Sequence, residues 1–297
     1  MTTAAILYLT VDEAGADQRL DNFLIRHLKG VPKTHIYRII RSGEVRCNKS
    51  RCKVDTRLAI GDQIRVPPIR LSATVQPTAE QAPARHFPLL FEDEDFLAIN
   101  KPAGVAVHGG SGVSFGVIEQ LRRAMPAHPF LELVHRLDRE TSGILLIAKK
   151  KRALTALQSQ FKARETGKVY LTLVKGEWPA NLKVIDTALA KFTLANGERR
   201  VRGVSKDDPN ALPSLSLVKV LKHHAARSAA GDAASSLLAV TIKTGRTHQI
   251  RVHMAALKLP LVGDPIYGGS AHPLMPRQAL HADLLSFDHP ISGQSMA

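Results

Sequence analysis

The sequence predicts an α+β protein made of two domains. Segments with apolar residues at helical spacing stand beside short runs that alternate apolar and polar residues, a pattern typical of strands. Between them, residues 67–88 contain five prolines and show no sustained periodicity, which indicates a semi-extended linker. We therefore expect a small domain over residues 17–75, a proline-rich linker over 76–87 and a larger domain over 88–297.

The small domain is expected to begin with two helices and to continue as short strands. Apolar residues recur at helical spacing twice, first as Leu20, Phe23, Leu24 and Leu28 and then as Ile36, Ile39 and Ile40. Ser42-Gly43 ends the second helix, and residues 44–47, 51–54 and 63–66 have a strand-like composition.

The charge of this small domain indicates a partner. Residues 17–70 hold 13 Lys or Arg and 5 Asp or Glu, a net charge of +8. Such a surplus, spread over two adjoining helices and the ribbon that follows, predicts contact with a nucleic-acid backbone. The alternative is a basic surface that is merely solvated.

The composition of the whole chain agrees with a polyanionic partner. Its 297 residues include 41 Lys or Arg against 26 Asp or Glu, a formal net charge of +15, which favours nucleic acid or an acidic membrane face. No run approaches the roughly 18 apolar residues that a membrane span needs, and Met1–Thr10 lacks the basic start of a signal peptide. Cys47 and Cys52 have no second cysteine pair or nearby histidine, so we expect no metal site and a cytoplasmic protein.

The larger domain is also predicted to be α+β. Strands are expected at residues 96–100, 144–148, 168–174 and 237–242, with a helix over about 150–164. The first strand leads into a turn, Lys101-Pro102-Ala103-Gly104, with one charged side chain at its edge. Tyr170 lies in the third strand, where a tyrosine is usually half-buried packing.

One short segment predicts chemistry. In HRLDRETSGI, residues 135–144, Asp138 stands between two arginines, and Ser142-Gly143 leads directly into the apolar run Ile144–Ala148. Nearby guanidinium groups favour the ionised form of a carboxylate, and a buried strand behind the turn would hold it rigidly. The pattern predicts a nucleophile or a base, and an Asp–Arg pair that only stabilises a loop is the alternative.

A second segment, KTGRTHQIRVH over residues 243–253, predicts a strand-to-helix junction. The preceding strand ends at Gly245, and Thr247 is expected to cap a helix whose core face carries Ile250, Met254 and Leu257. Arg246 would project beside free backbone N–H groups, a position suited to holding a carboxylate or a phosphate. His248 and His253 are five residues apart without an accompanying carboxylate motif, so we predict hydrogen bonding or RNA contact rather than metal binding.

These segments resemble two known families. Residues 19–66 are similar to the S4 domain, an RNA-binding module, and this likeness gives the expected RNA contacts as Lys33, Arg38, Arg41, Arg46 and Lys49. Downstream, NKPAGVAVH, HRLDRETSG, KVYLTLV and TGRTHQIRVHM occur in an order that resembles the RluA family of RNA pseudouridine synthases over about residues 90–290. The likeness is strongest to the RluC type, which acts on 23S (large-subunit) ribosomal RNA.

The resemblance implies a fold and a role for each site residue. The larger domain would be a pseudouridine synthase catalytic domain, built on a mixed, mainly antiparallel sheet with flanking helices. Asp138 matches the essential aspartate and Tyr170 the tyrosine beneath the base. Arg136, with His135 beside it, matches the arginine that fills the gap left by a flipped uridine. Arg246 matches the arginine that pairs with the aspartate.

The implied activity is that of an isomerase, an intramolecular transferase that needs no cofactor. Its partner would be 23S ribosomal RNA or a precursor of the 50S subunit, and we expect a monomer that does not contact membranes. A noncatalytic S4-type RNA-binding or ribosome-assembly factor is the alternative, but it leaves the Asp138 and Arg246 motifs unexplained. A protein kinase, suggested by HRLD, lacks its glycine-rich loop and DFG element here, and a haloacid-type hydrolase lacks its metal-binding carboxylates.

Overall fold

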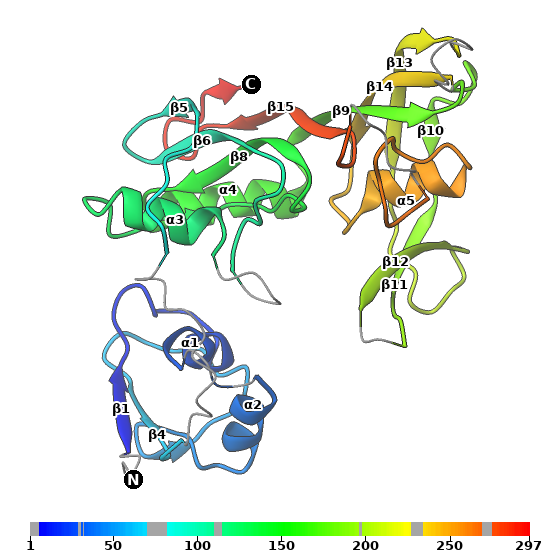
Figure 1. Ribbon diagram of the computed structural model, residues 1–297. Helices are drawn as coiled ribbons and strands as arrows, with labels where there is room; N and C mark the ends of the chain where they lie inside the picture. Colours follow the sequence, from blue (N-terminus) through cyan, green and yellow to red (C-terminus); the bar gives the residue numbers. More distant parts are fainter. Residues whose placement is uncertain are drawn as a thin grey trace. The chain divides into compact units, whose positions relative to one another are not determined.

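The chain folds into two compact units, Met1–Thr78 and Ala79–Ala297, drawn as ribbons in Figure 1. The computed structural model describes residues 6–28, 31, 33–69, 82–109, 115–195, 198–226, 234–268 and 275–297. Residues 76–81 of the predicted linker lie outside the described residues. Phe87, the last residue of the predicted linker, is buried in a core cluster of the second unit, so this end of the linker packs with that unit.

The first unit combines two helices with a four-stranded antiparallel sheet. The helices are α1 (Leu20–His27) and α2 (Lys33–Arg41), and the strand order is β1-β4-β2-β3. The strands are β1 (Leu7–Thr10), β2 (Arg46–Cys47), β3 (Ser50–Arg51) and β4 (Gln63–Val66). Both predicted helices are confirmed, and their apolar residues form the core of the unit. β2 and β3 are shorter than predicted, and β1, which pairs with β4, extends the sheet to residues before position 17.

The second unit is built on a ten-stranded sheet. Its order is β10-β13-β14-β9-β15-β8-β6-β5, with β16 beside β15 and β7 beside β8. Among the described strands the only parallel pairing joins β15 to β8, which confirms the mixed, mainly antiparallel sheet. The strands are β5 (Leu89–Glu92), β6 (Phe96–Lys101), β7 (Glu132–Leu133), β8 (Ser142–Ala148), β9 (Gly167–Lys175), β10 (Val184–Ile185), β13 (Ser216–His224), β14 (Ser235–Ile242), β15 (Leu280–Asp288) and β16 (Ser295–Met296).

Two helices cover β8 on its opposite faces. Leu145 and Ile147 belong to the core cluster that contains α3 (Val117–Ala124), whereas Leu146 and Ala148 belong to the cluster that contains α4 (Lys151–Ala163). Because successive side chains of a strand point to opposite faces, both faces of β8 are buried. This explains the unbroken apolar run in the sequence.

A third helix, α5 (Gln249–Ala256), covers the other half of the sheet (Figure 1). Ile250 and Met254 pack in a cluster with Leu238 and Val240 of β14 and with Trp178. A separate hairpin of β11 (Ala188–Thr193) and β12 (Arg199–Val204) packs beside α5 through Leu189, Val201 and Val252. In the described parts of the chain, no helix is long and apolar enough to cross a membrane.

Gly143 allows β8 and β15 to meet in the centre of the sheet. Its φ is +112°, and a Cβ atom at this position would lie 2.1 Å from the carbonyl oxygen of Ala282. Only glycine therefore permits the parallel pairing of residue 143 with Ala282. The turn that carries Asp138 is anchored directly before this contact.

Candidate active site

A cleft of about 590 Å³ brings the predicted motifs together. Its lining comes from the Asp138 turn, from Tyr170 on β9, from the N-terminal end of α5 and from the segments Ala106–Gly109 and Pro265–Ile266. Asp138, Tyr170, Arg136 and Arg246 all line it. Four residues predicted from three separate motifs therefore share one cleft.

Asp138 lies in a turn, with one arginine and one histidine beside its carboxyl group. Its backbone carbonyl accepts a hydrogen bond from the Thr141 N–H at 3.1 Å, and its side chain is 30 % exposed. Its Oδ2 atom lies 3.3 Å from Arg251 Nη1 and 3.7 Å from His248 Nε2. The other face of the carboxyl group remains accessible to a molecule in the cleft.

Arg251 links Asp138 to the protein interior. It is 4 % exposed, and its fork donates to fully buried Asp264 through Nε at 2.7 Å and Nη2 at 2.9 Å. Burial opposes the charge on Arg251, but hydrogen bonding and the charges of Asp264 and Asp138 raise its pKa. Burial likewise opposes the charge on Asp264, and Arg251 lowers its pKa. The two charges stabilise each other where neither would be stable alone.

The predicted pairing of Arg246 with Asp138 is wrong. Arg246 lies in the turn before α5, and its Nε donates to the carbonyl of Pro213 at 3.1 Å. The partner of Asp138 is Arg251, which lies in the first turn of the helix. The sequence contained an indication of this pairing. Arg251 stands three residues before Met254 and therefore lies on the core face of the predicted helix. A charged residue on such a face indicates a buried ion pair.

His248 contributes to the site through an unusual backbone conformation. It occupies the N-cap position of α5 in place of the predicted Thr247, with a φ of 54°. Its Nδ1 lies 2.8 Å from the hydroxyl of Tyr267, and its Nε2 faces Asp138. Burial lowers the pKa of His248, an effect that the charge of Asp138 partly opposes.

Tyr170 and Arg136 occupy different depths of the cleft. Burial, together with the charge of Asp138, raises the pKa of Tyr170, so its phenol stays protonated at neutral pH. Arg136 is exposed and lies at the opening. The roles expected for these two residues stay predictions.

The prediction that His135 contacts the substrate needs correction. Its ring stacks on Phe161 at 4.8 Å, and its Nε2 accepts a hydrogen bond from the Leu146 N–H at 3.2 Å. It is absent from the lining of the cleft. Burial lowers the pKa of His135 to about 4, so the neutral ring connects the Asp138 segment to β8 and α4.

Lys101, expected at the edge of a turn, is fully buried. Its ammonium group donates to three carbonyl oxygens, those of Pro102 at 2.9 Å, Val105 at 2.8 Å and Arg139 at 3.0 Å. Gly104 and Arg139 exchange two further hydrogen bonds. Lys101 therefore fastens the turn after β6 to the residue that follows Asp138. Sequence reasoning placed no function on this residue.

A buried polar network holds the start of α5. The side-chain amide of Gln249 bonds Thr244, Leu215 and Ser216, and His253 contacts the hydroxyls of Ser214 and Ser216 at 2.8 and 3.0 Å. His253 is therefore a hydrogen-bonding residue, one of the two roles expected for it. The network positions the helix that carries Arg251.

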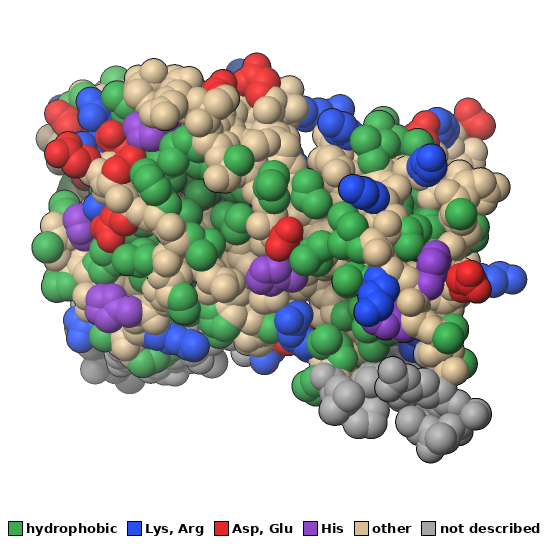
Figure 2. Space-filling view, turned by 90° about the horizontal axis from the view of Figure 1, so that it is seen from above, with side chains coloured by type: hydrophobic (Ala, Val, Ile, Leu, Met, Phe, Trp, Pro, Cys, Tyr) green, Lys and Arg blue, Asp and Glu red, His purple; other side chains and the backbone are tan. Residues whose placement is uncertain are grey.

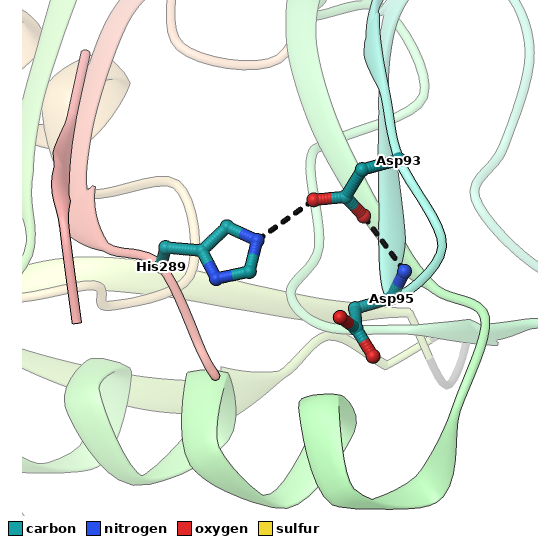
Figure 3. A group of neighbouring side chains, drawn as sticks. All are labelled: Asp93, Asp95 and His289. Carbon is teal, nitrogen blue, oxygen red and sulfur yellow. Dashed lines mark hydrogen bonds and ion pairs between the residues drawn. The ribbon is translucent and has the colours of Figure 1, made fainter. Parts of the chain in front are cut away.

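Figure 3 shows a group of Asp93, Asp95 and His289 that has ligand types suited to a metal ion. Asp93 accepts hydrogen bonds from the backbone of Asp95 at 2.7 Å and Phe96 at 2.9 Å, and its other oxygen lies 2.7 Å from His289. Asp95 is paired with Lys150 and Arg152. Because these carboxylates already have partners, the group fastens the turn between β5 and β6 to the turn before β16.

The predicted RNA contacts of the first unit lie at its surface. Lys33, Arg38, Arg41 and Lys49 are exposed, and Arg46 is half-buried. Arg38 forms an ion pair with Glu44 at 3.4 Å. Because an exposed ion pair is weak, Arg38 can still bind a phosphate group. These residues can reach phosphate groups.

The fold and the cleft place this chain in a class of RNA-modifying isomerases. Residues 95–256 match the family model described as RNA pseudouridylate synthase, and residues 18–64 match the S4 domain. The chain belongs to the RNA pseudouridylate synthase family, as a pseudouridine synthase with an N-terminal S4 domain.

Individual relatives support this assignment. The chain is 45% identical over 303 aligned positions to the protein named ribosomal large subunit pseudouridine synthase C of Escherichia coli strain K12, covering 98% of this chain and 91% of that protein. It is 43% identical to the protein of the same name from Yersinia pestis, with 98% and 90% covered. The solved structure of human RNA pseudouridylate synthase domain containing 1 superposes with a TM-score of 0.59 at 29% identity, covering 74% of this chain and 83% of that one.

Proposed function

We propose that this enzyme converts specific uridines of 23S ribosomal RNA, free or within a precursor of the 50S subunit, to pseudouridine, with Asp138 as the essential carboxylate. The observation that carries this proposal is the position of Asp138, at the opening of a cleft and ion-paired to the buried Arg251. The name and the high coverage of the bacterial relatives support the choice of ribosomal RNA.

The reaction needs the groups that the cleft holds. The N1–C1′ bond of uridine breaks, the uracil turns, and a C5–C1′ bond forms. A carboxylate can attack C1′ or assist removal of the C2′ proton while the base is detached. Tyr170 would support the base from below as a neutral phenol. No oxidant, reductant or imported group enters the balance, so we expect no cofactor.

Access to C1′ requires that the nucleotide leave its stack, at a cost of a few kcal/mol. Arg136, exposed at the opening, is the candidate to fill the gap. The S4 domain would add affinity through the exposed cations Lys33, Arg38, Arg41 and Lys49 together with Arg46. We propose that the enzyme acts as a monomer in the cytoplasm.

Two measurements test the proposal together. The purified enzyme should release tritium from [5-³H]uridine-labelled large-subunit ribosomal RNA, because C5 loses its hydrogen when it joins C1′. Ribosomal RNA from a strain that lacks the protein should lack pseudouridine at defined positions, as mapped by mass spectrometry and reverse transcription. If the enzyme modifies small-subunit ribosomal RNA or transfer RNA instead, the proposed substrate, 23S ribosomal RNA, is wrong, but the proposed pseudouridine synthase activity is correct.

A further inference from the structure

His248 connects two segments of the cleft wall through both nitrogens of its ring. Its Nδ1 lies 2.8 Å from the hydroxyl of Tyr267, and its Nε2 lies 3.7 Å from Oδ2 of Asp138. Histidines are ordinary on the molecular surface, where Figure 2 shows several among acidic and basic side chains. His248 differs from a surface histidine, because its side chain is only 19 % exposed and lines the cleft.

The hydrogen bonds of Tyr267 determine which nitrogen of His248 carries a proton. The Tyr267 hydroxyl accepts a bond from the Val201 N–H at 3.3 Å, and its own hydrogen has one acceptor among the described residues, Nδ1 of His248. Burial lowers the pKa of His248, so at neutral pH the ring is uncharged and carries a single N–H. With Nδ1 as the acceptor, that N–H is on Nε2 and faces Asp138. The opposite tautomer would place a nitrogen lone pair against a carboxylate.

The two oxygens of Asp138 have unequal surroundings. Arg251 Nη1 lies 3.3 Å from Oδ2, and His248 Nε2 lies 3.7 Å from the same atom. Among the described residues, no side chain or backbone N–H donates to Oδ1. Hydrogen bonds and positive charge stabilise the lone pairs of the oxygen that they contact, and this makes it a weaker nucleophile and a weaker base. Oδ1 is therefore the more reactive of the two oxygens.

We propose that His248 is a positioning residue, whose Nε2–H holds Oδ2 of Asp138 together with Arg251 and leaves Oδ1 free to react with the ribose. This inference rests on the proposed function and deepens it, because it assigns the reaction to one oxygen of the carboxylate. The distance of 3.7 Å between Nε2 and Oδ2 is longer than a hydrogen bond. Contacts of this kind often tighten when the substrate binds.

Both routes open to the carboxylate use an electron pair of Oδ1. In the first route this pair forms a bond to C1′, and the electrons of the N1–C1′ bond leave with the uracil. In the second route Oδ1 takes the proton from C2′, the C2′–H electrons form a double bond between C1′ and C2′, and the N1–C1′ electrons again leave with the uracil. Each route requires that Oδ1 points to the ribose, and holding Oδ2 in place ensures this orientation.

The test compares variants of the full chain by tritium release at saturating RNA, with folding checked by thermal denaturation. His248→Gly removes the ring and keeps the left-handed backbone, since glycine adopts the φ of 54° without strain. Its kcat should fall on the order of 50-fold, while RNA affinity stays within about three-fold. Added imidazole should raise the kcat of this variant by about ten-fold or more, because it can accept from Tyr267 and donate to Asp138 at once. N-Methylimidazole, which accepts but has no N–H, is the matched control and should change kcat by less than about two-fold.

Two further variants decide the question even if His248→Gly does not fold. His248→Gln can place an amide N–H where the Nε2–H lies, whereas His248→Asn is shorter and reaches only the position of Nδ1. We expect kcat of His248→Gln to exceed that of His248→Asn by about five-fold or more. A role for His248 in backbone conformation alone predicts the reverse order, because asparagine tolerates a left-handed conformation better than glutamine does.

Three outcomes would overturn the inference. The first is an equal effect of imidazole and N-methylimidazole on His248→Gly, and the second is a kcat of His248→Gln no higher than that of His248→Asn. The third is a folded His248→Gly variant whose kcat stays within about three-fold of the wild type. Failure of the wild type to release tritium from any RNA would instead refute the proposed function, on which this inference rests.

Discussion

At the scale of single residues, the site depends on a chain of charges that leads from solvent to the interior. Asp138 contacts Arg251, Arg251 contacts Asp264, and Asp264 accepts hydrogen bonds from the backbone N–H groups of Ile266 and Tyr267. The outer carboxylate is accessible and the inner one is not. This order gives the Asp138 carboxylate a fixed orientation, while Arg251 and Asp264 are the charges that are buried.

Replacing Asp138 by Asn should abolish activity with little change in shape. The amide keeps the volume of the side chain but can neither attack C1′ nor accept a proton from C2′. Tritium release from labelled RNA should fall below the limit of detection, while RNA affinity stays within a few-fold. A variant that retains more than about a tenth of the wild-type rate, a barrier change of only about 1.4 kcal/mol, would exclude the proposed role of Asp138.

The two arginines of the 246–251 segment should behave differently. Arg251→Lys keeps the charge but loses the planar fork that bonds Asp264 and Asp138 at once, so kcat should fall by about 100-fold or more, a barrier change of roughly 3 kcal/mol. Arg246→Lys should change kcat by less than about ten-fold, since the native contact of Arg246 is a single bond to Pro213. Single-turnover rates at saturating RNA measure both. The reverse order would restore Arg246 as the partner of the aspartate.

At the scale of elements, Lys101 shows how a buried cation can shape a catalytic turn. Lys101→Met would leave the carbonyls of Pro102 and Val105 without their donor, each costing about 1–3 kcal/mol when buried, whereas the carbonyl of Arg139 keeps the bond from the Gly104 N–H. We expect a lower melting temperature and a fall in kcat larger than any loss of RNA affinity. Measuring kcat and the dissociation constant for RNA tests this role. If kcat and RNA affinity fall by the same factor, or if a folded variant keeps the wild-type kcat, Lys101 does not position the turn.

His135 should make the stability of the second unit depend on pH. Its pKa is lowered from 6.5 to about 4 in the folded state by burial, so the unfolded chain binds more protons between these values. Stability should therefore decline as pH falls from about 6.5 towards 4, with His135 accounting for roughly 3 kcal/mol of the change. In His135→Gln the decline between pH 6.5 and 4 should be smaller by that amount, as measured by urea unfolding. An identical pH dependence in both proteins would show that the ring is not buried as a neutral base.

Sequence periodicity predicted the elements whose apolar pattern is strong. β8 and α4 fall within one or two residues of the expected bounds, because β8 is buried on both faces and α4 on one stripe. The missed elements include α3, β1, β5, β13, β15 and the β11–β12 hairpin. β1 exposes three of its four residues, and the hairpin places four cations in its strands, so neither shows a clear alternation.

The sequence motifs predicted which residues line the site, but not how these residues pair with one another. Asp138, Tyr170 and Arg246 line the cleft as expected, but the partner of the aspartate was misassigned. The choice between Arg246 and Arg251 depends on which face of α5 looks towards the Asp138 turn, and that follows from long-range packing of α5 on β14. The burial of Lys101 depends likewise on the distant carbonyl of Arg139.

At the scale of the whole molecule, each of the two units carries exposed cations. The exposed cations of the first unit lie on α2 and on the β2–β3 ribbon, whereas the residues that line the cleft belong to the second unit. Changes at sites that share no side chains should act independently. Substitutions in the first unit should then alter RNA affinity without altering the chemistry.

Charge reversal in the first unit should separate binding from chemistry. Lys33→Glu, Arg38→Glu and Arg41→Glu, combined in the full chain, should weaken binding to ribosomal RNA and reduce the salt slope by about 0.7–0.9 for each phosphate that is no longer neutralised. The value of kcat at saturating RNA should stay within about two-fold, because Asp138 and Arg251 lie in the other unit. Unchanged affinity and slope would mean that the basic surface of the S4 domain is only solvated, and a fall in kcat as large as the loss of affinity would show that binding and chemistry are not separate.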